Sequence, residues 1–353
     1  MDITKLLRPH LRDFRPYRSA RDEIAWSPQT IFLDANENAL GSPLDDGLNR
    51  YPDPLQRVLK EALGALVDLH PQNIFLGNGS DEAIDLLIRA FCEPQQDKIL
   101  ILPPTYGMYG VSAQVNHVQT VEVTLKSDFQ MNLPAINRAI ELDPSIKLIF
   151  ICSPNNPSGN LMAPADIEAL LQSFTGLIVL DEAYIDFADQ PSWTKRLVEF
   201  PNLIILQTFS KARGLAGARL GIAFARQPII EILNRIKPPY NISAINQRAA
   251  LSALKRQKRT NQTIAELKAE REKLRRFLQS LSFVEKVYPS QANFILIRLH
   301  GVSEVQKRLL RKGIVVRNRS GLPHCSSCLR ITVGSPQENE RLLETLLQIG
   351  NHL

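Results

Sequence analysis

Between residue 31 and about residue 235 the sequence alternates short apolar runs with longer amphipathic stretches. The apolar runs have the length of single strands, and the stretches between them have the length of helices. Such alternation is typical of β-α units around a mostly parallel sheet, whose strands are buried on both faces. The runs expected to form strands are residues 74–76, 99–102, 148–152, 177–180, 203–207 and 220–224. The sequence therefore predicts an α/β fold with helices on both faces of this sheet.

The length of the chain and a change of pattern after Pro238 and Pro239 indicate a second domain. A chain of 353 residues is longer than one hydrophobic core usually supports. The later part is expected to hold a long helix, strands at residues 294–299, 314–317 and 329–333 separated by helix, and a final helix. We predict an N-terminal arm over residues 1–30, a large domain over residues 31–237 and a smaller α+β domain over residues 238–353. The arm has few apolar residues, so we expect it to pack with the small domain.

Positive charge is concentrated in the last third of the chain. Residues 236–353 carry 21 Lys and Arg against 8 Asp and Glu, whereas residues 1–235 carry 21 against 28. Such an excess is typical of proteins with nucleic-acid, anionic-surface or small anionic partners. The basic runs at residues 255–259 and 271–276 lie in or beside a helix-period segment without interleaved aromatic residues. A solvated helix face is therefore the preferred interpretation, and nucleic acid is not an expected partner.

Composition also bears on membranes, disulfides and metals. No apolar run approaches the roughly 18 residues of a membrane span, and residues 1–18 lack the apolar stretch of a secretory signal. We therefore expect a cytoplasmic protein without a membrane partner. Four cysteines are too few for a disulfide scaffold in a chain of this length. Cys325 and Cys328 form a C-x-x-C pair, but no His pair supplies the other two ligands of a zinc site, so no metal is expected.

Several familiar ligand-binding motifs are missing from the sequence. It contains no G-x-x-x-x-G-K-[ST], no G-x-S-x-G and no H-E-x-x-H. The run from Gly77 to Gly79 begins like a dinucleotide-binding fingerprint, but Glu82 stands where the third glycine belongs. A dinucleotide site of that type is therefore not expected.

Polar residues instead follow the expected strands at their carboxyl ends, where open α/β sheets bind ligands. They are residues 77–81, 153–159 and 181–184, the pair Ser210 and Lys211, and Arg219. The first group precedes an expected helix over residues 80–91 with Ser80 as its N-cap, and its free N–H groups suit a phosphate. Each group alone also fits a structural role, such as a helix cap, a tight turn or a paired carboxylate. Their joint occurrence on one sheet favours a single site.

Together these residues meet the requirements of pyridoxal 5′-phosphate. The cofactor needs a lysine that bonds its aldehyde carbon, an acid that keeps its ring nitrogen protonated, donors for its phenolic oxygen, an aromatic neighbour and a phosphate cup. The candidates are Lys211 for the amine, Asp181 for the acid, Asn156 and Tyr184 for the phenolic oxygen, Tyr106 for the ring face, and Ser80, Thr208, Ser210 and Arg219 for the phosphate.

At these residues the chain resembles the fold-type I aminotransferases that use pyridoxal phosphate, and among them the histidinol-phosphate aminotransferase family. The resemblance runs nearly end to end and is most specific at residues 153–157 (SPNNP), 181–184 (DEAY) and 209–221 (FSKARGLAGARLG). It implies transamination between L-histidinol phosphate and 2-oxoglutarate, giving imidazole acetol phosphate and L-glutamate in histidine biosynthesis. It further implies that Lys211, Asp181 and Tyr184 are catalytic, with Lys211 as the base that moves the proton.

The same resemblance implies roles for residues outside the strand ends. Asp81 and Glu82 join the cofactor-binding set, and the protein is a homodimer in which Tyr51 reaches the cofactor phosphate of the neighbouring subunit. Residues implied to contact the anionic substrates are Tyr17, Asn36, Arg317 and Arg330. Two anionic substrates suit a basic small domain, which partly accounts for its charge.

Two kinds of alternative remain open. An aromatic amino acid aminotransferase or a threonine-phosphate decarboxylase would share the cofactor residues, although Tyr184 and residues 239–241 favour histidinol phosphate over the decarboxylase. A cofactor-binding regulator or nucleic-acid binder would use the basic last third. That alternative is disfavoured because no helix-turn-helix segment precedes the enzyme-like region.

Overall fold

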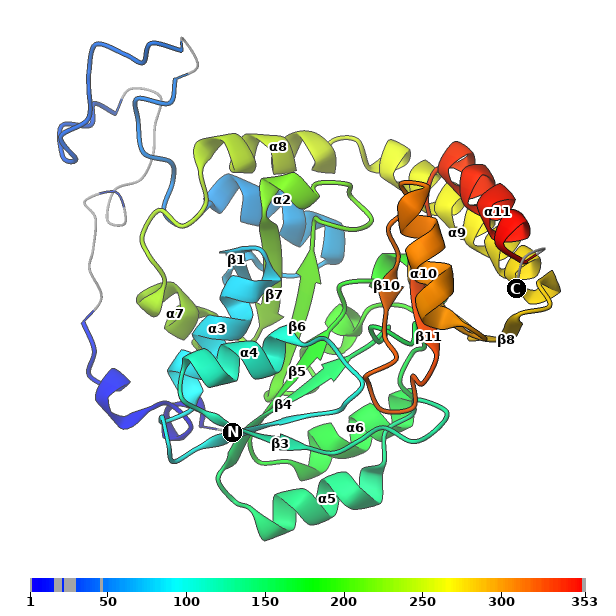
Figure 1. Ribbon diagram of the computed structural model, residues 1–353. Coiled ribbons are helices and arrows are strands. Elements are labelled where there is room, and N and C mark those ends of the chain that lie inside the picture. The colour runs from blue at the N-terminus through cyan, green and yellow to red at the C-terminus, as the bar shows by residue number, and fades with distance from the viewer. Residues whose placement is uncertain (1, 16–20, 22–29, 45–46, 351–353) are drawn as a thin grey trace.

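The six runs predicted as strands form six of the seven strands of one sheet in the computed structural model, which describes residues 2–15, 21, 30–44 and 47–350 (Figure 1). Its strands are β1 (Ile74–Asn78), β2 (Lys98–Ile101), β3 (Gln119–Glu122), β4 (Ile146–Cys152), β5 (Leu177–Asp181), β6 (Leu203–Thr208) and β7 (Leu220–Ala225). The order across the sheet is β1-β7-β6-β5-β4-β2-β3. Strands β6, β5, β4, β2 and β3 are parallel, and β7 runs antiparallel to β1 and β6. The predicted mostly parallel sheet is confirmed.

Both faces of this sheet are covered by helices, as the apolar runs predict. Along β5, Ile178 and Leu180 pack in one core while Leu177 and Val179 pack in the other, because successive side chains point to opposite faces. The helices on the first face are α2 (Arg57–Val67), α5 (Leu133–Leu142), α6 (Pro164–Ser173) and α8 (Ala244–Leu254). Those on the second face are α3 (Ser80–Phe91), α4 (Met108–Val115) and α7 (Gln227–Ile236).

Two details of the large sheet differ from the prediction. The polar strand β3 was not expected. It lies at the edge of the sheet next to β2, and its side chains are not buried. It therefore lacks the continuous apolar run by which the other strands were predicted. The N-cap of α3 is Gly79 rather than Ser80, which is the first helical residue. Gly79 has a φ of +78°, a conformation that side chains rarely adopt, so the chain turns at the glycine.

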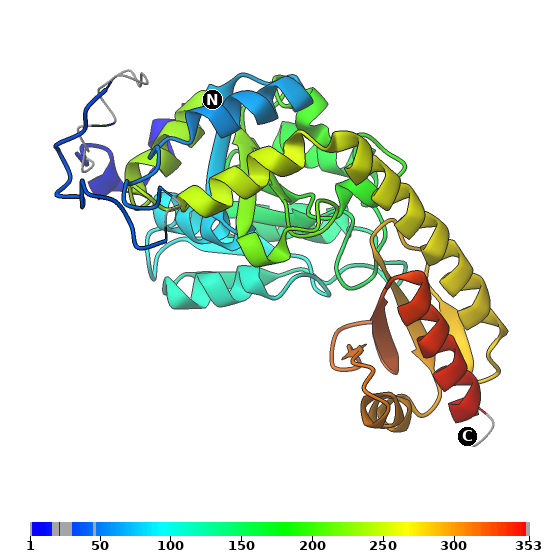
Figure 2. The same cartoon turned by 90° about the horizontal axis from the view of Figure 1, so that it is seen from above.

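The last third of the chain forms a four-stranded antiparallel sheet of order β10-β11-β9-β8. Its strands are β8 (Val284–Val287), β9 (Phe294–Leu299), β10 (Arg317–Asn318) and β11 (Cys328–Thr332), and its helices are α9 (Gln257–Ser280), α10 (Val302–Arg311) and α11 (Pro336–Gly350). Figure 2 shows α9 running outward from the large sheet with α11 beside it. The expected long helix is two helices, α8 and α9, and β10 is shorter than expected because it is an edge strand. The domain limits at residues 30 and 237 stay a prediction.

The described part of the N-terminal arm packs on the large domain. Ile3 and Leu7 are buried in the core that α3 and α7 share. The backbone N–H of Arg8 donates to Ala90 O at 2.9 Å, and the Arg235 side chain donates to Leu11 O at 3.1 Å. For residues 2–15, packing with the small domain was therefore the wrong expectation, because their apolar side chains match the apolar surface of α3 and α7.

Among the described helices, none combines the length and the apolar character that crossing a bilayer requires.

Candidate active site

A pocket of 160 Å³ lies at the carboxyl ends of β4, β5 and β6, the edge at which such sheets bind ligands. It brings together most of the predicted cofactor residues, namely Ser80, Asp81, Tyr106, Asn156, Asp181, Tyr184, Thr208, Ser210, Lys211 and Arg219. They come from five separate loops, which the sheet carries to one place. The pocket is therefore the candidate active site.

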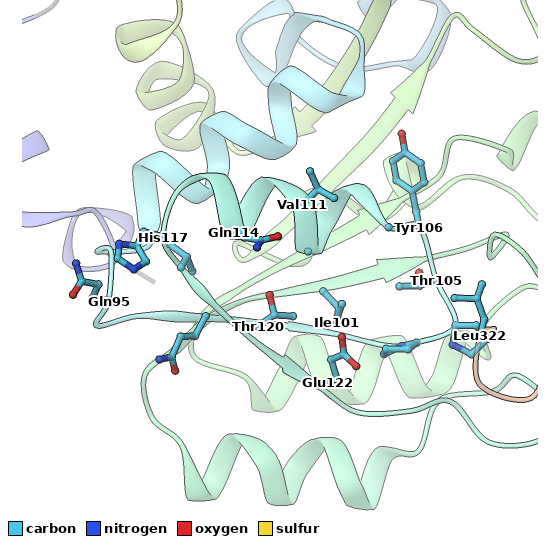
Figure 3. A pocket seen from close by; sticks show the side chains of 16 residues that line it. Gln95, Ile101, Thr105, Tyr106, Val111, Gln114, His117, Thr120, Glu122 and Leu322 are labelled. Carbon is cyan, nitrogen blue, oxygen red and sulfur yellow. The ribbon is translucent and has the colours of Figure 1, made fainter. Parts of the chain in front are cut away.

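A larger hollow of 650 Å³ lies beside it, between α4 and the edge strand β3 (Figure 3). Figure 3 shows Tyr106 at one end of this hollow and His117 and Gln95 at the other. Its described lining contains no lysine or arginine, and the side chains along its middle, such as Ile101, Val111 and Thr120, offer no acid and amine pair. The smaller pocket is the one equipped for chemistry.

Asp181 ends β5 with its side chain buried. Its carboxylate accepts a hydrogen bond of 2.6 Å from the hydroxyl of Tyr109 and one of 3.0 Å from the N–H of Ala183. Burial raises the pKa of Asp181, and these two hydrogen bonds lower it in part. A carboxylate in this position is stabilised by a cationic partner, because a buried charge without one is costly. Asp181 is thus placed to pair with a cationic group inside the pocket.

Lys211 lies in the loop that follows β6, with its Nζ 5.7 Å from the centre of the Tyr184 ring. Burial in the pocket lowers the pKa of Lys211, and the positive charge of Arg330 lowers it further. A lowered pKa increases the fraction of neutral amine, which is the form that acts as a nucleophile or base.

Anion-binding groups gather where the loop before Arg219 meets the start of α3. Gly79 has no side chain there, and a Cβ at this position would lie 2.6 Å from Arg219 Nη2. The hydroxyl of Thr208 donates to that of Ser210 at 2.9 Å in the neighbouring loop. Because the N-terminus of a helix is electropositive, α3 and Arg219 together favour a phosphate group.

Asp81 joins the ring neighbour to this anion site. Its carboxylate accepts a hydrogen bond from Tyr106 Oη at 3.1 Å and lies 3.4 Å from Arg219 Nη2. Tyr106 also packs edge-on against Tyr109, with ring centres 5.5 Å apart. Asp81 therefore positions both Tyr106 and Arg219 without being buried itself.

The small domain reaches the pocket through Arg330 on β11. The guanidinium of Arg330 donates to Asn156 Oδ1 and lies 5.2 Å from the Phe294 ring centre. Asn156 in turn donates to Tyr184 Oη at 3.5 Å. Arg317 lies directly opposite Arg330 on the neighbouring strand. The predicted substrate arginines thus lie side by side next to the pocket.

The other predicted site residues lie elsewhere in the chain. Glu82 accepts from the Asn78 N–H and from Asn241 Nδ2, so it shapes the turn before α3 and does not line the pocket. Asn36 and Tyr51 line a separate hollow, where the Tyr51 ring stacks on Tyr240 with centres 4.5 Å apart. Tyr17 lies outside the described residues.

Tyr109 is a site residue that the sequence reasoning missed. It is fully buried, stacks on Phe150 with ring centres 4.8 Å apart and donates to Asp181. The available signal was its position three residues after Tyr106, which was predicted to contact the cofactor ring. Nothing in the sequence links Tyr109 to a carboxylate 72 positions later.

The family model for aminotransferase class I and II matches residues 32–346. The chain therefore belongs to the class I and II aminotransferase family. It is 49% identical over 351 residues to a histidinol-phosphate aminotransferase of Christiangramia forsetii, covering 99% of both chains. It is 48% identical over 347 residues to the protein of that name from Flavobacterium johnsoniae, covering 98% of both.

Solved structures agree with this assignment. The histidinol-phosphate aminotransferase of Sinorhizobium meliloti, in complex with pyridoxal-5′-phosphate, matches with a TM-score of 0.81 and 25% identity over 90% of each chain. The enzyme of that name from Clostridium acetobutylicum matches with a TM-score of 0.80 and 26% identity, over 87% of this chain and 92% of that one. The chain thus has the fold of the pyridoxal-phosphate aminotransferases.

Proposed function

We propose that this chain is a pyridoxal-phosphate enzyme that transfers the amino group of L-histidinol phosphate to 2-oxoglutarate, a reaction of histidine biosynthesis. The products are imidazole acetol phosphate and L-glutamate. The observation that carries the proposal is one pocket lined by an amine, Lys211, a buried acid, Asp181, and Arg219. Arg330 lies next to this pocket, where it donates to Asn156 of the lining. Near-half identity over the whole chain to histidinol-phosphate aminotransferases supports the choice of substrate.

The residues of the pocket fit pyridoxal phosphate. The absence of a Cβ at Gly79 leaves room for the Arg219 side chain next to the start of α3, where the cofactor phosphate would be held with Ser80, Thr208 and Ser210. Asp181 would hold the protonated ring nitrogen, and Asn156 with Tyr184 would hold the phenolic oxygen. When bound, the cofactor supplies an electron sink that makes the substrate Cα–H acidic.

The remaining chemistry belongs to the chain. With its pKa lowered, Lys211 has more neutral amine at Nζ to accept the proton from substrate Cα. Tyr184 and Asn156 restrict the position of the reacting atoms, and Arg330 binds the anionic end of the substrate through its guanidinium. The same arginine can hold the distal carboxylate of glutamate, so two anionic substrates can use the pocket in turn.

A homodimer and a cytoplasmic location complete the proposal. In it, Tyr51 reaches the cofactor phosphate of the neighbouring subunit, and Tyr17, Asn36 and Arg317 add substrate contacts. The dimer is supported by a row of exposed apolar residues before Tyr51, which are Ile31, Leu33, Leu40 and Leu44 with 81%, 85%, 99% and 70% of their surface exposed. Several large apolar side chains exposed on one segment of the chain indicate that the segment is covered by a partner.

A substrate panel tests the proposal. The purified holoenzyme is given L-histidinol phosphate, L-phenylalanine or L-threonine phosphate with 2-oxoglutarate, and both glutamate and carbon dioxide are measured. We expect glutamate formation with the highest kcat/KM for L-histidinol phosphate and no carbon dioxide. Efficient transfer from phenylalanine with none from histidinol phosphate, or decarboxylation of threonine phosphate, would overturn the proposed substrate.

A further inference from the structure

One face of the four-stranded sheet carries a row of arginines. Arg317 on β10 is directly opposite Arg330 on β11, so both side chains lie on the same face. Arg319 is two residues beyond Arg317, and its N–H continues the ladder by donating to Cys328 O at 2.8 Å. Since side chains alternate along a strand, Arg319 shares the face of Arg317 and Arg330. We call these three residues the arginine row.

The arginine row faces the large domain and not the core of the small one. The opposite face of the sheet, with Leu329 and Ile331, packs in the small-domain core. Cys328, on the same face as the row, packs in a core of the large domain. Figure 1 shows β10 and β11 between α10 and the strands of the large sheet. The row therefore lies on the side of the small sheet that borders the candidate active site.

The arginine row has no counter-charge in the described part of the chain. No carboxylate there forms a salt bridge with any of its three guanidinium groups, and the only side chain that accepts from Arg330 is the neutral Asn156. Arg319 Nε is buried without a hydrogen-bond partner, and so is the hydroxyl of the next residue, Ser320. Burial lowers the pKa of Arg319, and the charges of Arg330 and Arg317 lower it further. Like charges at adjacent positions of a ladder repel each other. An anion bound beside the arginine row would therefore offset the repulsion between its guanidinium groups.

The number of donors indicates which anion. A carboxylate has one charge and two oxygens, which a single arginine can hold with two parallel hydrogen bonds. A phosphate monoester carries close to two charges and three terminal oxygens, so it can use a second and a third donor group. Arg319 Nε and Ser320 Oγ are two donors beyond those that a carboxylate at Arg330 would use.

We propose that Arg319 is a specificity-determining residue that binds the phosphate of a phosphorylated amino substrate, with Ser320 as a second donor. This inference rests on the proposed function, because it assigns a further contact to the same site. The contact with Arg319 distinguishes the phosphorylated amino substrate from glutamate, the other amino substrate of that site. The phosphorylated substrate uses Arg319, whereas glutamate needs only the arginines nearer the pocket.

The test compares Arg319→Gln and Arg319→Lys with the wild-type holoenzyme, measuring each half-reaction separately. Arg319→Gln is expected to raise the KM for L-histidinol phosphate on the order of 10- to 100-fold, as expected for loss of a charged hydrogen bond to phosphate. The KM for glutamate is expected to change by less than about threefold. Arg319→Lys keeps the charge without the planar fork, so it should recover part of the loss.

A matched control is Arg276→Gln, which removes the same charge from the exposed surface of α9, where Arg276 forms a salt bridge with Glu272. It should leave both KM values unchanged. The thermal unfolding midpoint of each variant shows whether it is folded. An unchanged KM for histidinol phosphate in Arg319→Gln, or an equal loss for both substrates in a folded variant, would overturn the proposal.

Inorganic phosphate separates this inference from the proposed function. With excess cofactor present, phosphate should inhibit the glutamate half-reaction of the wild type competitively, and Arg319→Gln should raise its inhibition constant. This result can be obtained even if the wild type does not act on histidinol phosphate, in which case only the proposed substrate fails. Equal inhibition of wild type and variant would contradict the role of Arg319.

Discussion

At the scale of single residues, the site depends on a carboxylate that the fold keeps ionisable although it is buried. Burial alone raises the pKa of Asp181, and the hydroxyl of Tyr109 and the N–H of Ala183 counter that rise. In the proposed reaction, activity needs the carboxylate form, because only that form would attract a protonated ring nitrogen of the cofactor. Activity is therefore lost as the pH falls through the pKa of Asp181.

Removing the Tyr109 hydroxyl should move this loss to higher pH. In Tyr109→Phe the carboxylate keeps its burial but loses one hydrogen bond, so the pKa of Asp181 rises further. We expect the acid limb of the kcat/KM profile to shift upward and kcat to fall about tenfold, in the range of one charged hydrogen bond. The pH dependence of the histidinol phosphate reaction provides the measurement.

Tyr106→Phe is the matched control, since the Tyr106 hydroxyl donates to Asp81 and not to Asp181. Its acid limb should stay where the wild type has it. If both variants have the same profile as the wild type, Tyr109 does not tune Asp181.

Some site residues could be predicted one by one from the sequence and others could not. Lys211 and Asp181 were predictable because each follows an apolar run that reads as a buried strand, and such strands place their carboxyl ends together. Tyr109 was not, because its hydrogen bond to Asp181 joins positions 72 residues apart in the chain. Arg319 was not, because the burial of its Nε without a hydrogen-bond partner depends on the surrounding packing. Local pattern carries no information on such pairs.

At the scale of elements, the turn between β1 and α3 determines how closely Arg219 approaches the helix. Gly79 has φ +78° and ψ +165°, a region that is almost exclusive to glycine. A Cβ there would also lie 2.6 Å from Arg219 Nη2. The turn therefore needs glycine for two separate reasons.

Gly79→Ala should weaken cofactor binding at least about tenfold. The strained backbone costs about 1–3 kcal/mol, and the added methyl group displaces the guanidinium that would hold the phosphate. Titration of the cofactor-free protein with pyridoxal phosphate measures the effect. Gly107→Ala is the control, because an added Cβ at Gly107 meets nothing within 4 Å. Equal dissociation constants for the two variants would contradict this account of the turn.

The elements that were predicted well are those whose hydrophobic pattern follows directly from burial against the sheet. The helix over residues 80–91 was predicted with its exact bounds, because its apolar stripe meets one face of the sheet. The edge strands β3 and β10 were missed or placed differently, because an edge strand pairs on one side and has no need of a continuous apolar run. Ser80 was expected as the N-cap, but the turn before α3 places Gly79 at the N-cap, because its φ of +78° favours glycine.

At the scale of the whole molecule, the proposed dimer makes two chains share each site. Tyr51 is half-exposed and is separated from Lys211 by 160 positions in the sequence. It follows the segment that carries the exposed side chains of Ile31, Leu33, Leu40 and Leu44. In a symmetric dimer each surface meets its own copy, so one chain can complete the pocket of the other. Such a dimer has two sites that each depend on both chains, whereas independent sites would each be complete within one chain.

Mixing two inactive variants tests the shared site. Tyr51→Ala lacks the group offered to the neighbour, and Lys211→Ala lacks the amine of its own pocket. When equal amounts of the two variants are unfolded and refolded together, half of the dimers are mixed and each mixed dimer has one complete site, so about a quarter of the wild-type activity should return. Refolding each variant alone is the control. No recovery in the mixture, with dimers present, would contradict the role of Tyr51.

The most direct measurement is the visible absorption of the holoenzyme when L-histidinol phosphate is added without 2-oxoglutarate. The account predicts that the absorption band of the bound cofactor disappears as the amino group is transferred, and that 2-oxoglutarate restores it. Lys211→Ala should bind the substrate without completing this cycle. A holoenzyme whose band is unaffected by histidinol phosphate, or a Lys211→Ala variant that cycles like the wild type, would contradict the central claim.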